Sequence, residues 1–311
     1  MKRSRVLMSA AALAGACVIG ASLTGFTALD AEEVNAVDAV AAVQQVAPEA
    51  VSGAISTSST SENAVDAKVN DSTVSVPTNP SDGVQVDAPG VSSDVTIGLP
   101  FANQASEATD SQAAGVVVYD NGNGSSTIPV VHQDGSLQIA TVIDNASAPK
   151  RYEYTLEGKS IQLTSDGAAA VYDGEGQLTS VVEAPWAKDT NGNDVPTHFE
   201  VAGDTLTQVV DFDANTAFPV VADPKYWWGV QLVLTSAQVN KGLALHGGAV
   251  AAFGGVAAVC AFLTAGVCGV IAAVIAAAFG INAAIISWCN ARGRGIYLNL
   301  YWAGAWTCSS R

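Results

Sequence analysis

The chain has 311 residues and carries 29 acidic residues against 13 lysines and arginines, which gives a formal net charge of −16. Basic residues this sparse, without a dense patch, exclude a nucleic-acid interface as the expected function. The charge is unevenly divided, because every acidic residue lies at or before Asp223 and residues 224–311 carry only cations. Such asymmetry within one chain is typical of parts that meet different partners.

The first 31 residues have the pattern of an export signal. Lys2, Arg3 and Arg5 precede an apolar run over residues 6–26, and small residues follow it. This order is typical of a secretory signal peptide, so we expect cleavage after residue 31 or 36 and a secreted or cell-surface protein. The long apolar run leaves an uncleaved anchor open as an alternative, and Cys17 leaves a lipoprotein open.

Residues 32–92 are rich in Ala, Val, Ser, Asp and Thr and contain no aromatic residue. Such a composition buries too little apolar surface to offset the entropy that ordering the chain costs. We therefore expect a disordered acidic linker here, with a short transient helix over residues 37–46.

Residues 93–223 alternate short β-prone runs with turn clusters. Asn-Gly and Asp-Gly pairs recur between the runs, and they supply the positive backbone angles that tight hairpins need. Short connections between similar strands favour an antiparallel β-sandwich or meander domain over a parallel α/β sheet. The expected strands span residues 95–98, 115–120, 127–132, 137–144, 152–157, 161–164, 168–172, 178–183, 198–202, 206–212 and 218–221.

Several runs in this region resemble one protein family. They read GVVVYD at 115–120, APWAKD at 184–189, VPTHFEV at 195–201, TLTQVV at 205–210 and FPVVADP at 218–224. They resemble a family of exported actinobacterial proteins of uncharacterised function, in which a β-rich region ends in [Tyr/Phe]-Pro-Val-Val-Ala-Asp-Pro and a variable, cysteine-containing C-terminal module follows. The resemblance covers residues 93–224, implies export and this domain order, and assigns no catalytic residue.

Residues 224–311 are expected to form a small, disulfide-stapled helical module of β-α-α-α-β order. Apolar residues alternate from Trp228 to Leu234 and again from Ile296 to Trp302, which predicts a first and a last strand able to pair. Thr235 and Gln238 have the spacing of a capping box, so a helix is expected to begin there. Two apolar helices should follow over residues 249–263 and 267–289.

Four cysteines lie in this module, and an exported protein is expected to join them as disulfides. Cys260 and Cys268 flank the turn between the two apolar helices, so we favour the pairs Cys260–Cys268 and Cys289–Cys308. The sequence leaves the two other pairings open. The spacing lacks a metal-binding knuckle, so no metal site is expected.

Residues 242–291 contain no charged side chain. One interpretation makes them the buried core of the module, and the other makes them a helical hairpin that crosses a bilayer, for which ~20 residues per helix suffice. Aromatic residues at the interfaces and nearby cations would favour anionic lipid. The residues expected to contact a membrane or partner are Trp227, Trp228, Val270, Ile271, Val274, Ile275, Trp288, Arg292, Arg294 and Trp302.

No catalytic constellation stands out in the sequence. His132 and His198 lie in strand-like runs, His246 precedes two glycines, and there is no Gly-x-Ser-x-Gly elbow, so we expect neither an enzyme nor a cofactor. The run from Asp189 to Glu200 has Asp194 where a calcium loop needs glycine, so a solvated hairpin loop is expected instead.

Two hypotheses for function follow. The first is an exported non-enzymatic protein whose C-terminal module is membrane-active or bacteriocin-like and is held soluble by the acidic N-terminal region. Its partner would be an anionic membrane surface or a cell-envelope component. The alternative is a cell-surface or wall-associated interaction protein that binds through its β-rich domain.

Overall fold

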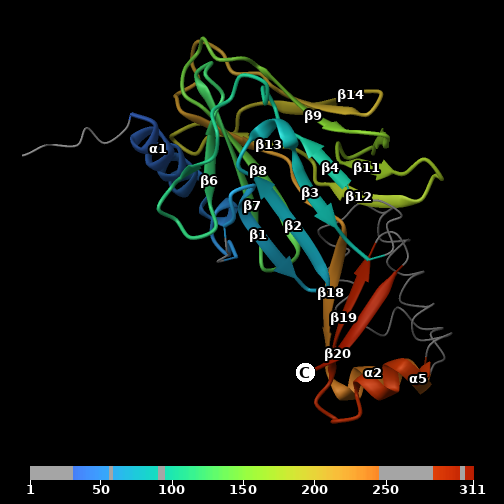
Figure 1. Cartoon of the computed structure of the whole chain (residues 1–311). Coiled ribbons are helices and arrows are strands. Elements are labelled where there is room, and N and C mark those ends of the chain that lie inside the picture. Colours follow the sequence, from blue (N-terminus) through green and yellow to red (C-terminus); the bar gives the residue numbers. More distant parts are fainter. Residues whose placement is uncertain (1–30, 56–58, 90–94, 245–282, 302–304) are drawn as a thin grey trace, which may run out of the picture.

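The computed structural model describes residues 31–55, 59–89, 95–244, 283–301 and 305–311, and it consists mainly of antiparallel strands (Figure 1). The helices are α1 (Ala31–Val46), α2 (Ser236–Ala244) and α5 (Ala283–Cys289), with 3₁₀ turns at Pro48–Ala50 and Pro80–Asp82.

The strands form three sheets. A seven-stranded sheet has the order β1 (Asn63–Val69), β2 (Ser72–Pro77), β3 (Val84–Asp87), β4 (Val95–Gly98), β9 (Arg151–Leu156), β15 (Thr205–Val210) and β14 (Thr197–Ala202). A ten-stranded sheet has the order β10 (Ser160–Leu163), β11 (Ala169–Tyr172), β12 (Leu178–Val182), β17 (Lys225–Trp227), β8 (Ser136–Ile143), β7 (Ser125–Val131), β6 (Val117–Asp120) and β5 (Thr109–Asp110). Its other two strands are β13 (Trp186–Lys188) and β16 (Val220–Asp223), which pairs with β8. The third sheet, called here the C-terminal sheet, is β18 (Gly229–Leu234), β19 (Ile296–Tyr301) and β20 (Trp306–Ser310).

One apolar core joins the two large sheets. In β9 exposed and buried residues alternate, and its buried residues Tyr152, Tyr154 and Leu156 point inward. They share a cluster with Leu137 and Ile139 of β8 in the other sheet. The expected antiparallel β-rich architecture is thus confirmed, and the strands expected over residues 95–221 all have counterparts in it.

The central strands β7 and β8 are buried along their whole length. One face of these strands belongs to the core between the sheets. The other face is covered by α1, whose Val40 and Val43 pack with Ile128 and Val142 in a separate apolar cluster (Figure 1). The ten-stranded sheet therefore lies between a helix and a second sheet.

The expectation of a disordered linker over residues 32–92 was wrong for the residues described there. They form α1 and strands β1 to β3, and alternate valines of these strands are buried in the main core. Composition misled the prediction, because valine and alanine suffice for burial when they recur every second position on a strand and face an apolar surface. The buried residues are Val65, Ala67, Val69, Val74, Val76, Val84 and Val86.

The expected boundary between residues 223 and 224 falls inside the ten-stranded sheet. Strand β17 follows Pro224 directly and pairs with β8 and β12. Asp223 itself is only 2 % exposed, and the Gln138 amide donates a hydrogen bond to its carboxylate. Burial raises the pKa of Asp223 well above its usual range, and repulsion from Glu183 adds to this effect.

The C-terminal sheet extends from one end of the two large sheets, and α2 and α5 lie at its far end (Figure 1). Strand β18 pairs with β19 over its whole length, as the sequence predicts, and β20 adds a third strand. The capping box is also confirmed: Thr235 Oγ1 accepts a hydrogen bond from the Gln238 backbone N–H at 3.3 Å, and Gln238 Oε1 accepts one from the Thr235 N–H at 2.9 Å. Helix α2 begins at the next residue, Ser236.

The disulfide Cys289–Cys308 ties the end of α5 to β20, with 6.1 Å between the two Cα atoms. Cys260, Cys268, the helix expected over 249–263 and most of the helix expected over 267–289 lie outside the described residues. Of this segment the structure describes the helices α2 and α5, so the full β-α-α-α-β order is not established.

The turn between β1 and β2 holds the C-terminal sheet against the rest of the protein. The Gln231 amide donates to Asn70 Oδ1 at 2.7 Å, and Asp71 Oδ2 accepts hydrogen bonds from Asn299 and Thr307. The Trp228 indole N–H donates to Ser72 Oγ at 2.9 Å. These contacts, called here the β1–β2 clamp, join the N-terminal part of the fold to its last strands.

The clamp is reinforced by apolar packing. Leu232 and Leu298 of the C-terminal sheet share a buried cluster with Leu178 and Val181 of β12. The C-terminal sheet therefore has no core of its own that is separate from the large sheets.

Docking of α1 can be tested with two valines of that helix. We expect Val43→Ala, at a fully buried position, to lower the free energy of unfolding by about 2 kcal/mol, because two methyl groups are removed and a cavity is left. Val37→Ala is the matched control, since Val37 is 38 % exposed on the same helix and the change in helix propensity is the same. Urea denaturation measures the free energy of unfolding of both variants. An equal loss in Val43→Ala and Val37→Ala would contradict the packing of α1 on the sheet.

The raised pKa of Asp223 predicts that the free energy of unfolding depends on pH. Because its pKa is higher in the folded protein, its stabilising contribution is complete below the unfolded pKa of about 4 and is lost as pH rises toward the folded pKa. Asp223→Asn should therefore gain stability over the parent protein as pH rises from acid to neutral, by at most about 1.4 kcal/mol per pH unit. Denaturation at a series of pH values checks this, with the exposed Asp194→Asn as control. A gain that does not change with pH would contradict it.

Candidate surface-binding site at the C-terminal tip

Helix α5 presents an apolar side chain pair to solvent. Trp288 is 77 % exposed and Ile285 is 50 % exposed, and their spacing of three places them on one face of the helix. Ile286 and Cys289 point the other way and are buried against the C-terminal sheet. A large exposed aromatic side chain beside an aliphatic one is typical of a contact surface.

The loop that follows α5 carries two exposed arginines, Arg292 and Arg294. The Asn290 side chain fixes this loop, because it donates to Ser236 Oγ at 3.0 Å and accepts from the Gly295 N–H at 3.1 Å. Gly295 has a φ of 98°, and a Cβ there would lie 2.1 Å from the Leu234 carbonyl oxygen, so only glycine fits.

A third arginine joins this loop from the other end of the segment. The Arg311 backbone N–H donates to the Gly295 carbonyl at 3.1 Å, which brings the last residue beside Arg292 and Arg294. We call the surface formed by Ile285, Trp288, Arg292, Arg294 and Arg311 the C-terminal tip.

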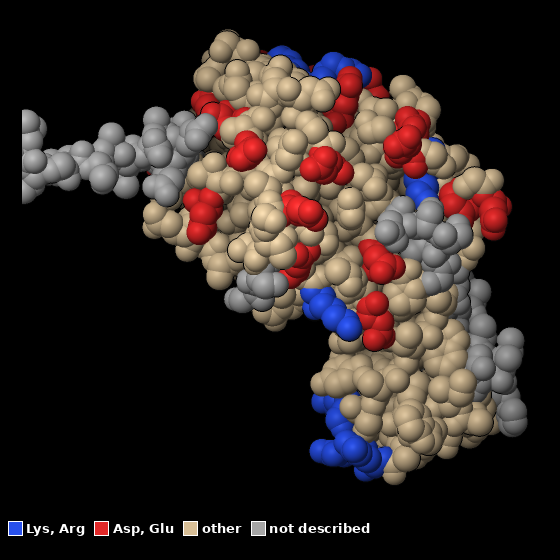
Figure 2. Space-filling view, viewed as in Figure 1, with Lys and Arg blue, Asp and Glu red and all other residues tan. Residues whose placement is uncertain are grey.

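The charges of the molecule are separated in space as well as in sequence. Figure 2 shows acidic side chains spread over the face of the two large sheets, and a group of cations at the end where the C-terminal sheet lies. Residues 224–311 contain no acidic residue, so none of their own carboxylates neutralises these arginines. An anionic surface would therefore meet the tip with little repulsion from it.

The residues that the sequence predicted to contact a membrane or partner fall into three groups: exposed at the tip, buried or half-buried, and outside the described residues. Trp288, Arg292 and Arg294 are exposed at the tip. Trp228 is only 5 % exposed and belongs to the main core, and Trp227 is half-buried with its indole N–H donating to Glu183 at 2.5 Å. Trp228 cannot serve as a contact in this conformation, because its side chain packs in the core. The assignment of Trp227 stays a prediction. The other predicted contacts, Val270, Ile271, Val274, Ile275 and Trp302, lie outside the described residues.

Sequence reasoning missed two members of the tip, Ile285 as an exposed residue and Arg311 as a neighbour of the arginine loop. The spacing of Ile285 and Trp288 was visible, but both were placed within a longer expected helix whose apolar stripe obscured the pair. Arg311 reaches the loop only because β20 pairs with β19, and the short run over Trp306–Ser310 gave no strand signal.

The other candidate sites of the sequence have ordinary structural surroundings. His198 is exposed between Glu200 and Asp211, at 3.5 and 3.6 Å. His132 is buried, and desolvation is the main cause that lowers its pKa. His246 lies outside the described residues.

The expected hairpin loop after Asp189 is present. Asp189 Oδ1 accepts hydrogen bonds from the backbone N–H groups of Asn191 and Asn193, each at 2.9 Å, and Gly192 has the positive φ of a tight turn. The side-chain bond from Asn193 is the largest cause that lowers the pKa of Asp189. These bonds organise the turn.

Among the described residues, no helix combines the length and apolarity needed to cross a bilayer. Comparison with protein-family models, with curated proteins and with solved structures finds no match to this chain.

Proposed function

We propose that this chain is an exported, non-enzymatic protein whose C-terminal tip binds an anionic surface of a membrane or of the cell envelope. One observation carries the proposal: Trp288, at 77 % exposure, lies next to a loop that bears Arg292 and Arg294 and has no acidic residue nearby in sequence. Aromatic side chains favour the interface between lipid and water, and arginines near an anionic leaflet gain electrostatic energy.

The tip is proposed to act in the intact chain and not as a released fragment. Cleavage beside Asp223 would cut a strand of the ten-stranded sheet at a residue that is 2 % exposed. It would also leave Trp228 and the C-terminal sheet without the core that they share with the large sheets. The acidic region is therefore proposed to support the tip structurally as well as to keep the protein soluble.

The proposal is tested by sedimenting the purified full-length protein with lipid vesicles. We expect it to bind phosphatidylglycerol vesicles and to bind phosphatidylcholine vesicles much less. Because each arginine near an anionic surface contributes about 1 kcal/mol, the double variant Arg292→Gln/Arg294→Gln should bind about 30-fold more weakly. Trp288→Ala should weaken binding to both lipids, since it removes the apolar contact.

Lys68→Gln/Lys159→Gln provides the matched control, because it removes the same charge from β1 and from the turn between β9 and β10. It should bind as the parent protein does. Equal binding to both lipids would contradict the proposal, because the arginines would then contribute nothing to it. An equal loss in the two double variants would contradict it too, because net charge and not the tip would then govern binding.

A further inference from the structure

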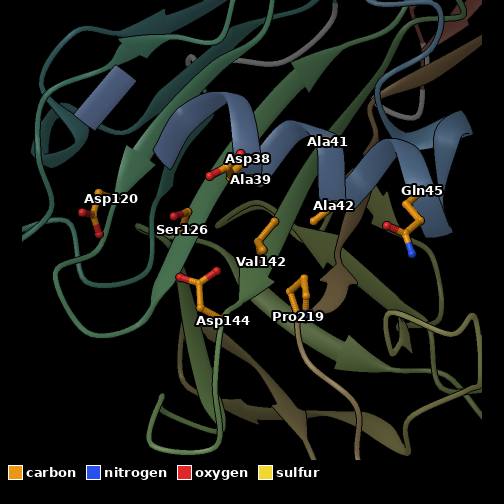
Figure 3. A pocket seen from close by; sticks show the side chains of 10 residues that line it. All are labelled: Asp38, Ala39, Ala41, Ala42, Gln45, Asp120, Ser126, Val142, Asp144 and Pro219. Atoms are coloured by element: carbon orange, nitrogen blue, oxygen red, sulfur yellow. The ribbon is translucent and has the colours of Figure 1, made fainter. Parts of the chain in front are cut away.

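A second site lies between α1 and the outer face of the ten-stranded sheet. Figure 3 shows a cavity lined by α1 on one side and by the ends of β6, β7 and β8 on the other. Its volume is about 440 Å³. Asp38, Asp120 and Asp144 surround one end of it, and Ala42, Val142 and Pro219 form its middle (Figure 3). Its size is in the range of pockets that hold small molecules.

The sheet geometry explains why carboxylates gather here. Every second residue of β6, β7 and β8 points toward α1, and these residues are apolar beneath the helix. At the end of each strand the same alternation places a polar residue: Asp120 after Val118, Ser126 before Ile128, and Asp144 after Val142. Asp38 adds a carboxylate from the helix, one turn before Ala42.

Ser126 gives independent evidence that the cavity is built for a ligand. It is only 6 % exposed, and its side chain lies among the three carboxylates on the cavity wall (Figure 3). No hydrogen-bond partner of its hydroxyl is found within the described part of the chain. Because this side chain lines the cavity, its hydroxyl is free to accept a hydrogen bond from a bound donor.

The chemistry of the lining selects the kind of ligand. Within the described residues no three carboxylates, histidines or cysteines come close enough together to hold a metal ion. An ammonium group needs fewer ligands, because it can pair with one of the carboxylates and the hydroxyl and leave its other N–H to water. The apolar middle of the cavity, at Ala42, Val142 and Pro219, can then cover a chain of methylene groups.

Asp144 supports the same assignment. Its pKa is raised mainly by burial and further by repulsion from Asp120, so these two carboxylates lie together at an electrostatic cost. A cation between them would remove that cost.

We propose that this cavity binds a primary ammonium group carried on a short methylene chain, as in a lysine side chain or a free alkylamine. The site lies on a different surface from the C-terminal tip, and it holds whether or not the tip binds lipid.

The test is calorimetric titration of the full-length protein with pentylamine and with Nα-acetyl-lysine methylamide. We expect pentylamine to bind and neutral pentanol not to bind. Asp144→Asn should weaken binding by about tenfold or more, because it removes one of the facing charges. Ala42→Leu should weaken it as much while leaving every charge in place, because it fills the apolar middle. A higher affinity for the lysine derivative would indicate that the natural ligand is a lysine side chain of a peptide or polymer. A higher affinity for pentylamine would indicate a free amine.

Asp87→Asn is the matched control, since it removes an exposed carboxylate of β3 that is remote from the cavity in sequence and does not line it. It should bind pentylamine as the parent protein does. An equal loss in Asp87→Asn and Asp144→Asn would overturn the proposal by showing non-specific attraction to an acidic protein. Absence of amine binding at millimolar concentration, or displacement of the amine by stoichiometric Ca²⁺, would overturn it too.

Discussion

The need to cover both faces of β7 and β8 governs this fold. These strands contain hardly any exposed residue, so an apolar layer is required on each side of the ten-stranded sheet. The seven-stranded sheet provides one layer with tyrosines and leucines. Helix α1 provides the other with alanines and valines alone. The segment before the first strand is therefore part of the folded core, although its composition resembles that of a linker.

The same dependence extends to the C-terminal end. The C-terminal sheet buries one face against α2 and α5 and shares its apolar cluster with β12. The β1–β2 clamp then fixes its orientation through side chains of Asn70, Asp71 and Ser72. The charge, the cysteine content and the aromatic content of the sequence all change at Asp223. The apolar core continues across this point. The division is one of surface chemistry: an acidic body supports a cationic, aromatic tip within one continuous structure.

The sequence predicted the elements whose signals are local. Hairpin strands between Val95 and Val221, the capping box at Thr235, the pairing of β18 with β19 and the disulfide between Cys289 and Cys308 all appear as expected. It did not predict what depends on distant partners. Val43 is buried only because Ile128 and Val142 face it, and Trp228 is buried only because Ser72 and its neighbours cover it. The sequence indicated only part of the arginine group, since Arg292 and Arg294 are two residues apart whereas Arg311 reaches them through strand pairing. The cavity under α1 could not be foreseen while α1 was assigned to a linker.

The β1–β2 clamp has a kinetic consequence. Its bonds from Asp71 to Asn299 and Thr307 join residues 228 and 236 positions apart, so they close some of the longest loops that this chain can form. Contacts of such high sequence separation slow folding. Because a polypeptide is made from its N-terminus, Asp71 is synthesised 228 residues before Asn299 and 236 residues before Thr307. The clamp and the Cys289–Cys308 bridge can therefore form only after β20 has been synthesised. Until β19 has been synthesised, the edge of β18 that pairs with it is uncovered, and exposed edges of this kind promote aggregation.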